Sequence, residues 1–139
     1  MAPADEAVIR RYYEATSRGD HGALEQVLDP NFVLHSPISE QPITGVQGYK
    51  DMISTYLNAS PGLSIHVDEL NIEGDTARVR WTARYHHTGD FRGHQATDRQ
   101  GSLSGSDTIR LAGGRIAEVW NELDLGETEQ QLGFSPKLS

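Results

Sequence analysis

The sequence has 139 residues, the usual size of one domain with a single hydrophobic core. Its formal net charge of -8 argues against nucleic acids and anionic membranes as partners, because binding to phosphate-rich surfaces depends on clustered Lys and Arg. The lack of cysteine excludes disulfides and thiolate metal sites, and the N-terminus has no apolar stretch long enough for a signal peptide, so we expect a cytoplasmic protein.

The beginning of the chain has the periodicity of helices. Within residues 5–27, apolar side chains recur at helical spacing with an interruption at Gly19, which predicts two helices separated at that glycine. The segment Asp29-Pro30-Asn31 ends the helical pattern, because proline disfavours helical backbone in the residue before it. Residues 32–35 then predict a short strand.

A loop and a third helix follow. Residues 36–48 contain two prolines and two glycines, a composition typical of a loop. The apolar spacing in residues 49–57 predicts an amphipathic helix, which Ser60-Pro61-Gly62 ends. Beyond this point apolar and polar residues alternate, which is the pattern of half-buried strands. The alternating segments are residues 63–72, 76–87, 102–111 and 115–123.

The order of these elements predicts the fold class. Glycine-containing connections at Glu73-Gly74-Asp75 and Ala112-Gly113-Gly114 are typical of hairpins. Helices followed by long antiparallel strands indicate an α+β fold, in which the N-terminal helices pack on one face of a curved, mainly antiparallel sheet. We expect residues 1–139 to form a single cone-shaped domain with an open interior. One strand face is predicted to be buried, namely Ala77, Val79, Trp81, Ala83 and Tyr85.

Motifs near the end of the chain are those of a known family. The segment GRIAEVWNELD, residues 114–124, is followed by Gln130-Gln131-Leu132-Gly133. Further matches are His87-Thr88-Gly89 with Gly93, Ser104-Gly105 at the entry to a strand, and Arg10-Arg11 in the first helix. In this order and spacing, the sequence resembles over nearly its whole length the SnoaL-like polyketide cyclases of the nuclear-transport-factor-2-like superfamily.

This resemblance implies a fold and a chemistry. The family has a conical α+β barrel, is frequently oligomeric, and encloses a hydrophobic cavity. There it closes rings in aromatic polyketides by intramolecular aldol condensation, without metal or cofactor. By resemblance we therefore predict a small-molecule aromatic polyketide as ligand, no cofactor, no metal and a homodimer.

Two positions depart from the cyclase pattern. A gap-free alignment of the terminal motifs places Asn121 where the cyclases have a proton-transferring aspartate, and Asp107 where they have a histidine. A carboxamide does not bind and release a proton near working pH, so Asn121 can hold or polarise a substrate oxygen, or simply satisfy backbone groups. With Asn121 at this position, the sequence is more similar to the AclR-like anthracycline hydroxylases, a branch with the same fold. This resemblance implies hydroxylation, with a partner reductase that prepares the substrate.

A second alignment keeps the acid on the last strand. Many broader family members have a Trp-x-x-x-Asp pattern that Trp120 and Asp124 reproduce, which makes Asp124 an alternative catalytic carboxylate. Strand alternation separates the two alignments, because Val119, Asn121 and Leu123 share one face whereas Asp124 lies on the other unless a bulge intervenes.

Other site candidates follow from predicted faces and side-chain chemistry. Asp107 lies on the apolar side of its strand, where burial would raise its pKa towards that of a general base; a solvated strand end or an arginine pair is the alternative. His35 could hydrogen-bond a substrate carbonyl or be a hydrogen-bonded core histidine. Tyr12, Tyr13 and Trp81 could stack on a planar substrate or pack in the core.

Motifs for other chemistries are weak or absent in the sequence. His86 and His87 are adjacent in a predicted strand and point to opposite faces, so they cannot easily share a metal ion. The sequence has no glycine-rich phosphate loop between a strand and a helix, and no Gly-x-Ser-x-Gly motif. Three functions stay open: a hydroxylase, a cyclase, and a non-catalytic ligand-binding or dimerisation module.

Overall fold

A computed structural model describes residues 3–138, so Met1, Ala2 and Ser139 of the predicted domain lie outside the described residues. The elements in chain order are α1 (Pro3–Arg18), α2 (His21–Val27), β1 (Leu28–His35), β2 (Ile43–Thr44), α3 (Gly45–Ala59), β3 (Ser64–Glu73), β4 (Thr76–His86), β5 (Gln100–Ala112), β6 (Arg115–Leu123) and α4 (Gly126–Leu132). The predicted order of helices and then strands is confirmed, and α4 is an addition to it.

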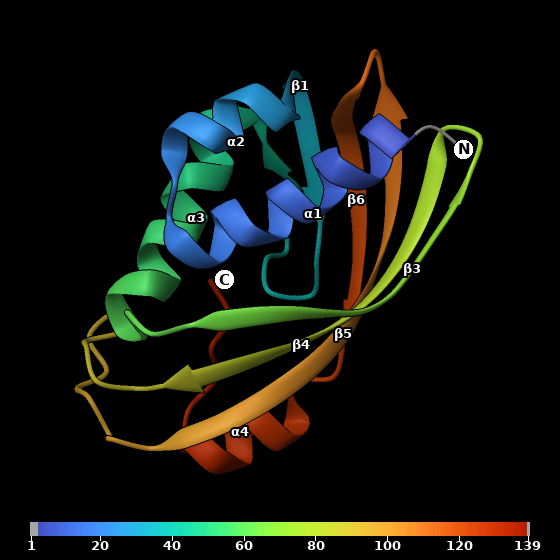
Figure 1. The fold of residues 1–139 in the computed structure, drawn as a ribbon. Helices are drawn as coiled ribbons and strands as arrows, with labels where there is room; N and C mark the ends of the chain where they lie inside the picture. Colours follow the sequence, from blue (N-terminus) through green and yellow to red (C-terminus); the bar gives the residue numbers. More distant parts are fainter. Residues whose placement is uncertain (1–2, 139) are drawn as a thin grey trace.

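The strands form one sheet in the order β2-β1-β6-β5-β4-β3. Neighbouring strands are antiparallel except for β1 and β6, which are parallel. The described edge strands β2 and β3 do not pair with each other, so the expected barrel is a strongly curved sheet that stays open. The long strands β3, β4 and β5 bend sharply near their middle, and α1, α2 and α3 lie over one face (Figure 1). The α+β fold class is therefore confirmed.

The two N-terminal helices separate at Gly19 as predicted. Its φ of 65° is in the left-handed region, which glycine adopts without steric cost, and α1 ends there. The Asp20 side chain then accepts a hydrogen bond from the Ala23 backbone N–H at 3.1 Å and caps α2. None of the described helices is long and apolar enough to cross a membrane.

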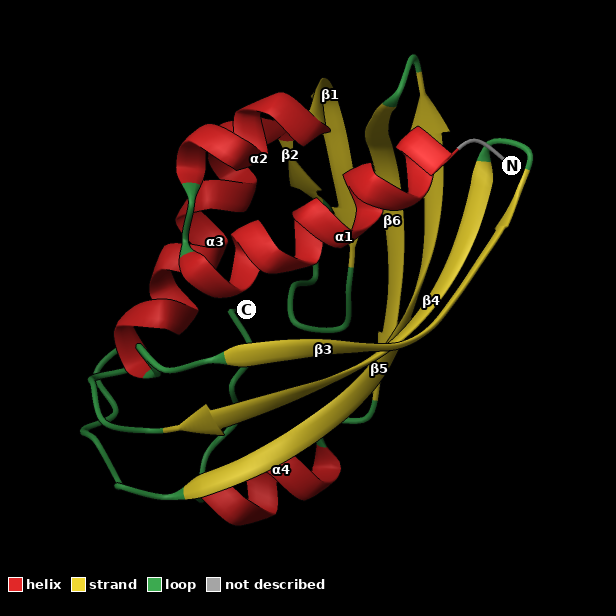
Figure 2. Ribbon diagram, viewed as in Figure 1, coloured by secondary structure: helices red, strands yellow, loops and turns green. Residues whose placement is uncertain are grey.

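A single apolar core joins the helices to the sheet. Helix α1 contributes Ile9, Tyr12 and Tyr13, and the facing strands contribute Val79 and Ile109 among others. Each such side chain stabilises the fold by about 1.5–3 kcal/mol when it is fully buried. The secondary-structure view shows the helical layer above the concave face and α4 beneath the first part of β5 (Figure 2).

The alternation predicted for β4 is confirmed. Ala77, Val79 and Ala83 are buried, whereas the intervening Arg78 and Arg80 are exposed. The same alternation continues across the sheet, because β4 pairs in register with β5 along its whole length. One face of β4 and β5 is therefore available to enclose an interior space.

Three boundaries differ from the sequence prediction. Leu28, which directly follows the predicted helical segment, has extended backbone and begins β1 by pairing with Ile116 of β6, four residues before the predicted strand. The predicted loop contains β2, which pairs with β1, and α3 begins at Gly45, before the first residue of its apolar pattern. These differences arise because strand pairing between distant segments supplies hydrogen-bond partners that a local pattern does not reveal.

Gly105 in β5 is expected to be sensitive to the smallest side chain. A Cβ at this position would lie 2.5 Å from Trp81 Cζ2 and 3.0 Å from the Glu122 carbonyl oxygen. Because an added carbon in a packed site forces its neighbours to move, Gly105→Ala should lower the free energy of unfolding by about 1–3 kcal/mol in denaturant titrations. Gly62→Ala is the control, since a Cβ there meets nothing within 4 Å; equal stability of the two variants would contradict the prediction.

Candidate active site

A cavity of about 220 Å³ lies between the helical layer and the concave face of the sheet. Most of its lining is apolar or aromatic, and the polar side chains in it are Thr16, Ser36, Ser60, His87, Asp107, Asn121 and Thr128. Curvature of the sheet keeps this space free of side chains. The open interior expected from the sequence is therefore present, and it is suited to a bulky apolar molecule with a few polar groups.

The chain after α4 forms one wall of the cavity. Phe134 and Pro136 line it, and the Tyr56 hydroxyl donates a hydrogen bond to the Pro136 carbonyl at 2.7 Å. Further along, the Leu138 N–H donates to the Ile38 carbonyl at 2.7 Å. These bonds hold the C-terminal segment against α3 and the loop after β1.

Asp107 is the one acidic residue in the lining, and its carboxylate accepts three side-chain hydrogen bonds. Oδ2 accepts from the Tyr13 hydroxyl at 2.5 Å and from Trp81 Nε1 at 3.1 Å, and Oδ1 accepts from Asn121 Nδ2 at 2.7 Å. The donors come from α1, β4 and β6, while Asp107 itself is in β5 and only 6% exposed. Four elements therefore fix one carboxylate inside an apolar space.

Burial dominates the electrostatics of this carboxylate. Desolvation raises the pKa of Asp107 above its ordinary value, although the hydrogen bonds from Tyr13, Asn121 and Trp81 each oppose the rise. Desolvation and the nearby charge of Asp107 also raise the pKa of the Tyr13 hydroxyl, which therefore stays protonated and keeps donating. A carboxylate with increased proton affinity and fixed orientation is suited to general-base catalysis.

Asn121 orients the carboxylate from the neighbouring strand. It lies directly opposite Asp107 in the antiparallel register of β5 and β6. The Ser36 hydroxyl donates to Asn121 Oδ1 at 2.7 Å, so the amide nitrogen faces Asp107. One hydrogen of that amide nitrogen binds Asp107, which leaves the other free for an oxygen atom of a ligand.

Comparison with known proteins identifies the family. The model of the SnoaL-like polyketide cyclase family matches residues 6–132. The chain belongs to this family. The predicted family resemblance is thereby confirmed, and no curated protein sequence matches the chain.

Solved structures of other proteins share this fold. TsrD from Streptomyces laurentii is 27% identical with a TM-score of 0.82, over 96% of this chain and 98% of that chain. IdmH, a proposed polyketide cyclase from Streptomyces antibioticus, is 26% identical with a TM-score of 0.81, over 93% and 98% of the two chains. AclR, a proposed hydroxylase from Streptomyces galilaeus, is 22% identical with a TM-score of 0.80, over 93% and 95%, and shows the fold alone.

The last strand has the orientation that the gap-free family alignment requires. Asn121 and Leu123 line the cavity and Val119 is fully buried, whereas Trp120 is 40% exposed. Asp124 is exposed, lines a shallow hollow on the opposite face of the sheet and accepts a hydrogen bond from the Gly126 N–H at 2.9 Å. The expectation that Asp124 is an alternative carboxylate of this cavity is corrected, because β6 pairs regularly with β5 from Asn121 to its last residue, Leu123, and the following Asp124 lines the opposite face.

His35 also lies outside the cavity. Its Nε2 is 2.7 Å from Glu118 Oε2, and its ring stacks on Trp120 with a centroid distance of 5.6 Å. The preceding residue Leu34 lines the cavity instead. The prediction of a substrate-binding His35 is corrected by this placement, because neighbouring residues of β1 point to opposite faces.

Aromatic side chains form the wall nearest to Asp107. Tyr12 and Trp81 both line the cavity, and their contact with a substrate stays a prediction. The Tyr12 ring contacts those of Tyr13 and Tyr49, at centroid distances of 4.9 and 5.5 Å. Sequence analysis missed the bonds from Tyr13 to Asp107 and from Ser36 to Asn121. These partners are far apart in the chain and share no local motif.

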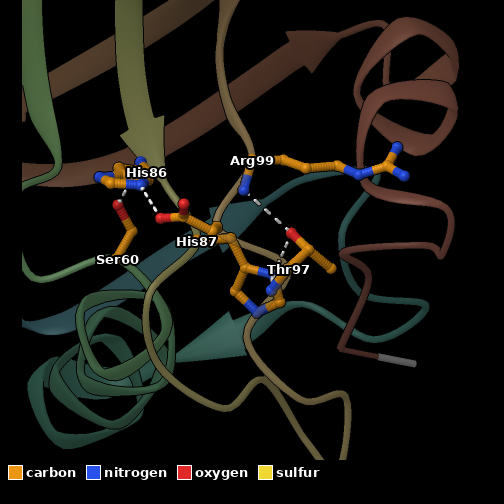
Figure 3. Close-up of polar contacts among 6 residues, drawn as sticks. Ser60, His86, His87, Thr97 and Arg99 are labelled. Atoms are coloured by element: carbon orange, nitrogen blue, oxygen red, sulfur yellow. Dashed lines mark hydrogen bonds and ion pairs between the residues drawn. The ribbon is translucent and has the colours of Figure 1, made fainter.

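His86, the last residue of β4, and His87, which follows it, point in different directions, as predicted (Figure 3). His86 is partly exposed, with Nε2 2.6 Å from Asp98 Oδ1, whereas His87 is buried and lines the cavity. Within residues 3–138, no group of three or more His, Asp or Glu side chains could hold a metal ion.

The raised pKa of Asp107 predicts a pH-dependent stability. The folded protein holds this proton more tightly than the unfolded chain, whose value is near 3.8, so the contribution to stability is full below that pH. It is lost as the pH rises through the folded-state value. We therefore expect the free energy of unfolding of Asp107→Asn to rise relative to that of wild type as the pH increases from below 3.8 through the folded-state pKa of Asp107.

Urea titrations of both proteins across this range measure the difference, in which the other titrating groups cancel. A difference that is constant with pH, or that moves against the variant, would contradict the raised pKa.

Proposed function

We propose that this protein hydroxylates an anthracycline-type aromatic polyketide without a cofactor of its own, with Asp107 as the general base. The observation that supports this most is the one acidic side chain of an aromatic-lined cavity, held by three donors and with a raised pKa. Membership of the SnoaL-like family supports a polyketide ligand. Asn121 places an amide where the cyclases that this sequence resembles carry their acid. This difference favours hydroxylation over cyclisation.

The proposed reaction uses a substrate that a partner reductase has reduced to the hydroquinone. Asp107 removes a proton from it, and the electron-rich anion forms a carbon–oxygen bond with dioxygen. Dioxygen takes two electrons from the hydroquinone, which returns to the quinone, and two from the carbon–hydrogen bond that becomes carbon–hydroxyl. One oxygen atom enters the product and the other leaves as water.

The protein contributes positioning and a dry environment to this sequence. The free amide hydrogen of Asn121 is available to a developing oxyanion, because its partner oxygen is held by Ser36. Tyr12 and Trp81 provide flat apolar surfaces for a polycyclic substrate. Exclusion of water strengthens these interactions and protects a reactive anion from side reactions.

Oxygen-18 labelling tests the proposal directly. The protein is incubated with a reduced anthracycline-type aglycone and labelled dioxygen, and mass spectrometry follows the product. We expect one labelled oxygen atom per product, a loss of rate of about 10²-fold or more in Asp107→Asn, and full activity in Asp124→Asn, whose side chain lies outside the cavity. An added oxygen without label would overturn the hydroxylase proposal.

The cyclase function is the second candidate, and it is favoured by family membership and by the 26% identity with IdmH. An intramolecular aldol condensation needs a proton removed from a carbon next to a carbonyl, which Asp107 can also accept. The product has the same mass as the substrate, whereas hydroxylation adds one oxygen. The same mass spectra therefore separate the two functions.

The pH profile of turnover tests the role assigned to Tyr13. Its hydrogen bond lowers the pKa of Asp107, so Tyr13→Phe should raise that pKa and move the acid limb of the pH–rate profile to higher pH. Tyr12→Phe is the matched control, because the Tyr12 hydroxyl is not among the three donors to Asp107. An unchanged acid limb in Tyr13→Phe would argue against Asp107 as the titrating base.

The predicted homodimer and reductase stay predictions. Trp120, on the outer face of β6, is the one large hydrophobic side chain that is exposed among the described residues. It lies beside His35, and both are accessible to a second subunit.

A further inference from the structure

The cavity has a second group of buried polar atoms that the proposed reaction does not use. Among the described residues, His87 Nε2 and Thr128 Oγ1 are the buried side-chain atoms without a hydrogen-bond partner. Both residues line the cavity and are only 3% exposed. Because buried polar groups are nearly always hydrogen-bonded, unpaired atoms in a cavity wall indicate a place where a ligand supplies the partner.

The surroundings of His87 determine which kind of partner it needs. Its Nδ1 accepts from the Thr97 backbone N–H at 3.2 Å, and that N–H can only donate. The Thr97 hydroxyl, which accepts from the Arg99 N–H at 3.2 Å, lies 3.0 Å from the same Nδ1 (Figure 3). With Nδ1 as acceptor, the ring proton is on Nε2. His87 therefore presents a buried N–H donor.

This donor lies further along the sheet than Asp107. Val79 lies opposite Asp107 in the sheet, and His87 follows eight residues later, directly after the end of β4, so the path along the chain is at most about 26 Å. The bend of β4 shortens the direct path across the cavity. Phe134, whose ring centroid is 5.4 Å from that of His87, provides an apolar surface beside the donor.

Two parts of the cavity wall therefore differ in hydrogen-bonding character. In one the Asp107 carboxylate accepts, and in the other His87 Nε2 donates. We propose that His87 is a specificity-determining residue that binds a carbonyl or other oxygen acceptor at the end of the ligand remote from the reacting centre. This inference rests on the proposed function for the class of ligand, an elongated polycyclic polyketide. It fixes which end of such a molecule faces Asp107.

Two substitutions of His87 separate the Nε2–H donor from the hydrogen bonds that Nδ1 makes with Thr97. In His87→Asn, the amide can replace Nδ1 beside Thr97 but has no donor at the position of Nε2. In His87→Gln, the longer side chain can return an N–H to that position. The probes are 2-acetylanthracene, which carries a carbonyl acceptor, and 2-ethylanthracene, which has a similar shape and no acceptor. Ligand fluorescence gives the Kd of each pair.

We expect His87→Asn to weaken binding of 2-acetylanthracene by about tenfold, the loss of one hydrogen bond to a buried group, and to leave 2-ethylanthracene unchanged. His87→Gln should restore much of the discrimination between the two probes. Equal effects of His87→Asn on both probes, or no effect on either, would overturn the proposal.

A measurement on the wild type keeps the inference testable if a variant does not fold. His87 is the only buried histidine among the described residues. In protein whose histidines carry nitrogen-15, its Nε2–H should therefore exchange slowly with water. Its resonance should shift with 2-acetylanthracene and not with 2-ethylanthracene. The same shift with both probes would count against a bond to the carbonyl.

Failure of this inference is distinguishable from failure of the proposed function. Binding of either anthracene needs no turnover, so discrimination by His87 without oxygen-18 incorporation removes only the hydroxylase proposal. Oxygen incorporation together with equal binding of the two probes removes only the His87 site.

Discussion

The hydrogen-bonded carboxylate of Asp107 is the interaction on which the site depends. A buried carboxylate costs several kcal/mol unless donors surround it, and here the donors are Tyr13, Trp81 and Asn121. Because they come from α1, β4 and β6, a shift of the helix relative to the sheet would leave the charge without a partner. The docking of α1 on the sheet and the reactivity of the carboxylate are therefore set by the same contacts.

Curvature of the sheet gives this carboxylate its surroundings. Gly105 lets the Trp81 ring lie against β5, so that Trp81 is both a wall of the cavity and a donor to Asp107. A register shift between Val67 and Glu69 interrupts the regular pairing of β3 with β4, and such irregularities increase local bending. The space left between bent strands and helices is apolar, and this raises the pKa of the one acid in it.

Sequence patterns predicted the parts of the site that depend on strand periodicity. Alternation placed Asp107 and Asn121 on an inner face, because a period of two persists along a regular strand. It failed for His35, where Val33 and Leu34 are both apolar and only the parallel pairing of β1 with β6 decides which of them faces inward. The partner of Tyr13 is 94 residues away, so no local signal could identify it.

The pair formed by Asp107 and Asn121 connects this site to the family it belongs to. By resemblance, the cyclases carry an aspartate at position 121 and a histidine at position 107, and here the carboxylate is on the opposite member of the pair. The two residues face each other across β5 and β6, and their side chains are 2.7 Å apart. Relative to the cyclases, the carboxylate therefore lies on the neighbouring strand, displaced by about 5 Å. In the proposed reaction, a base displaced by that distance would remove a proton from a different atom of a substrate held in the same cavity, and in this way one fold could support two reactions.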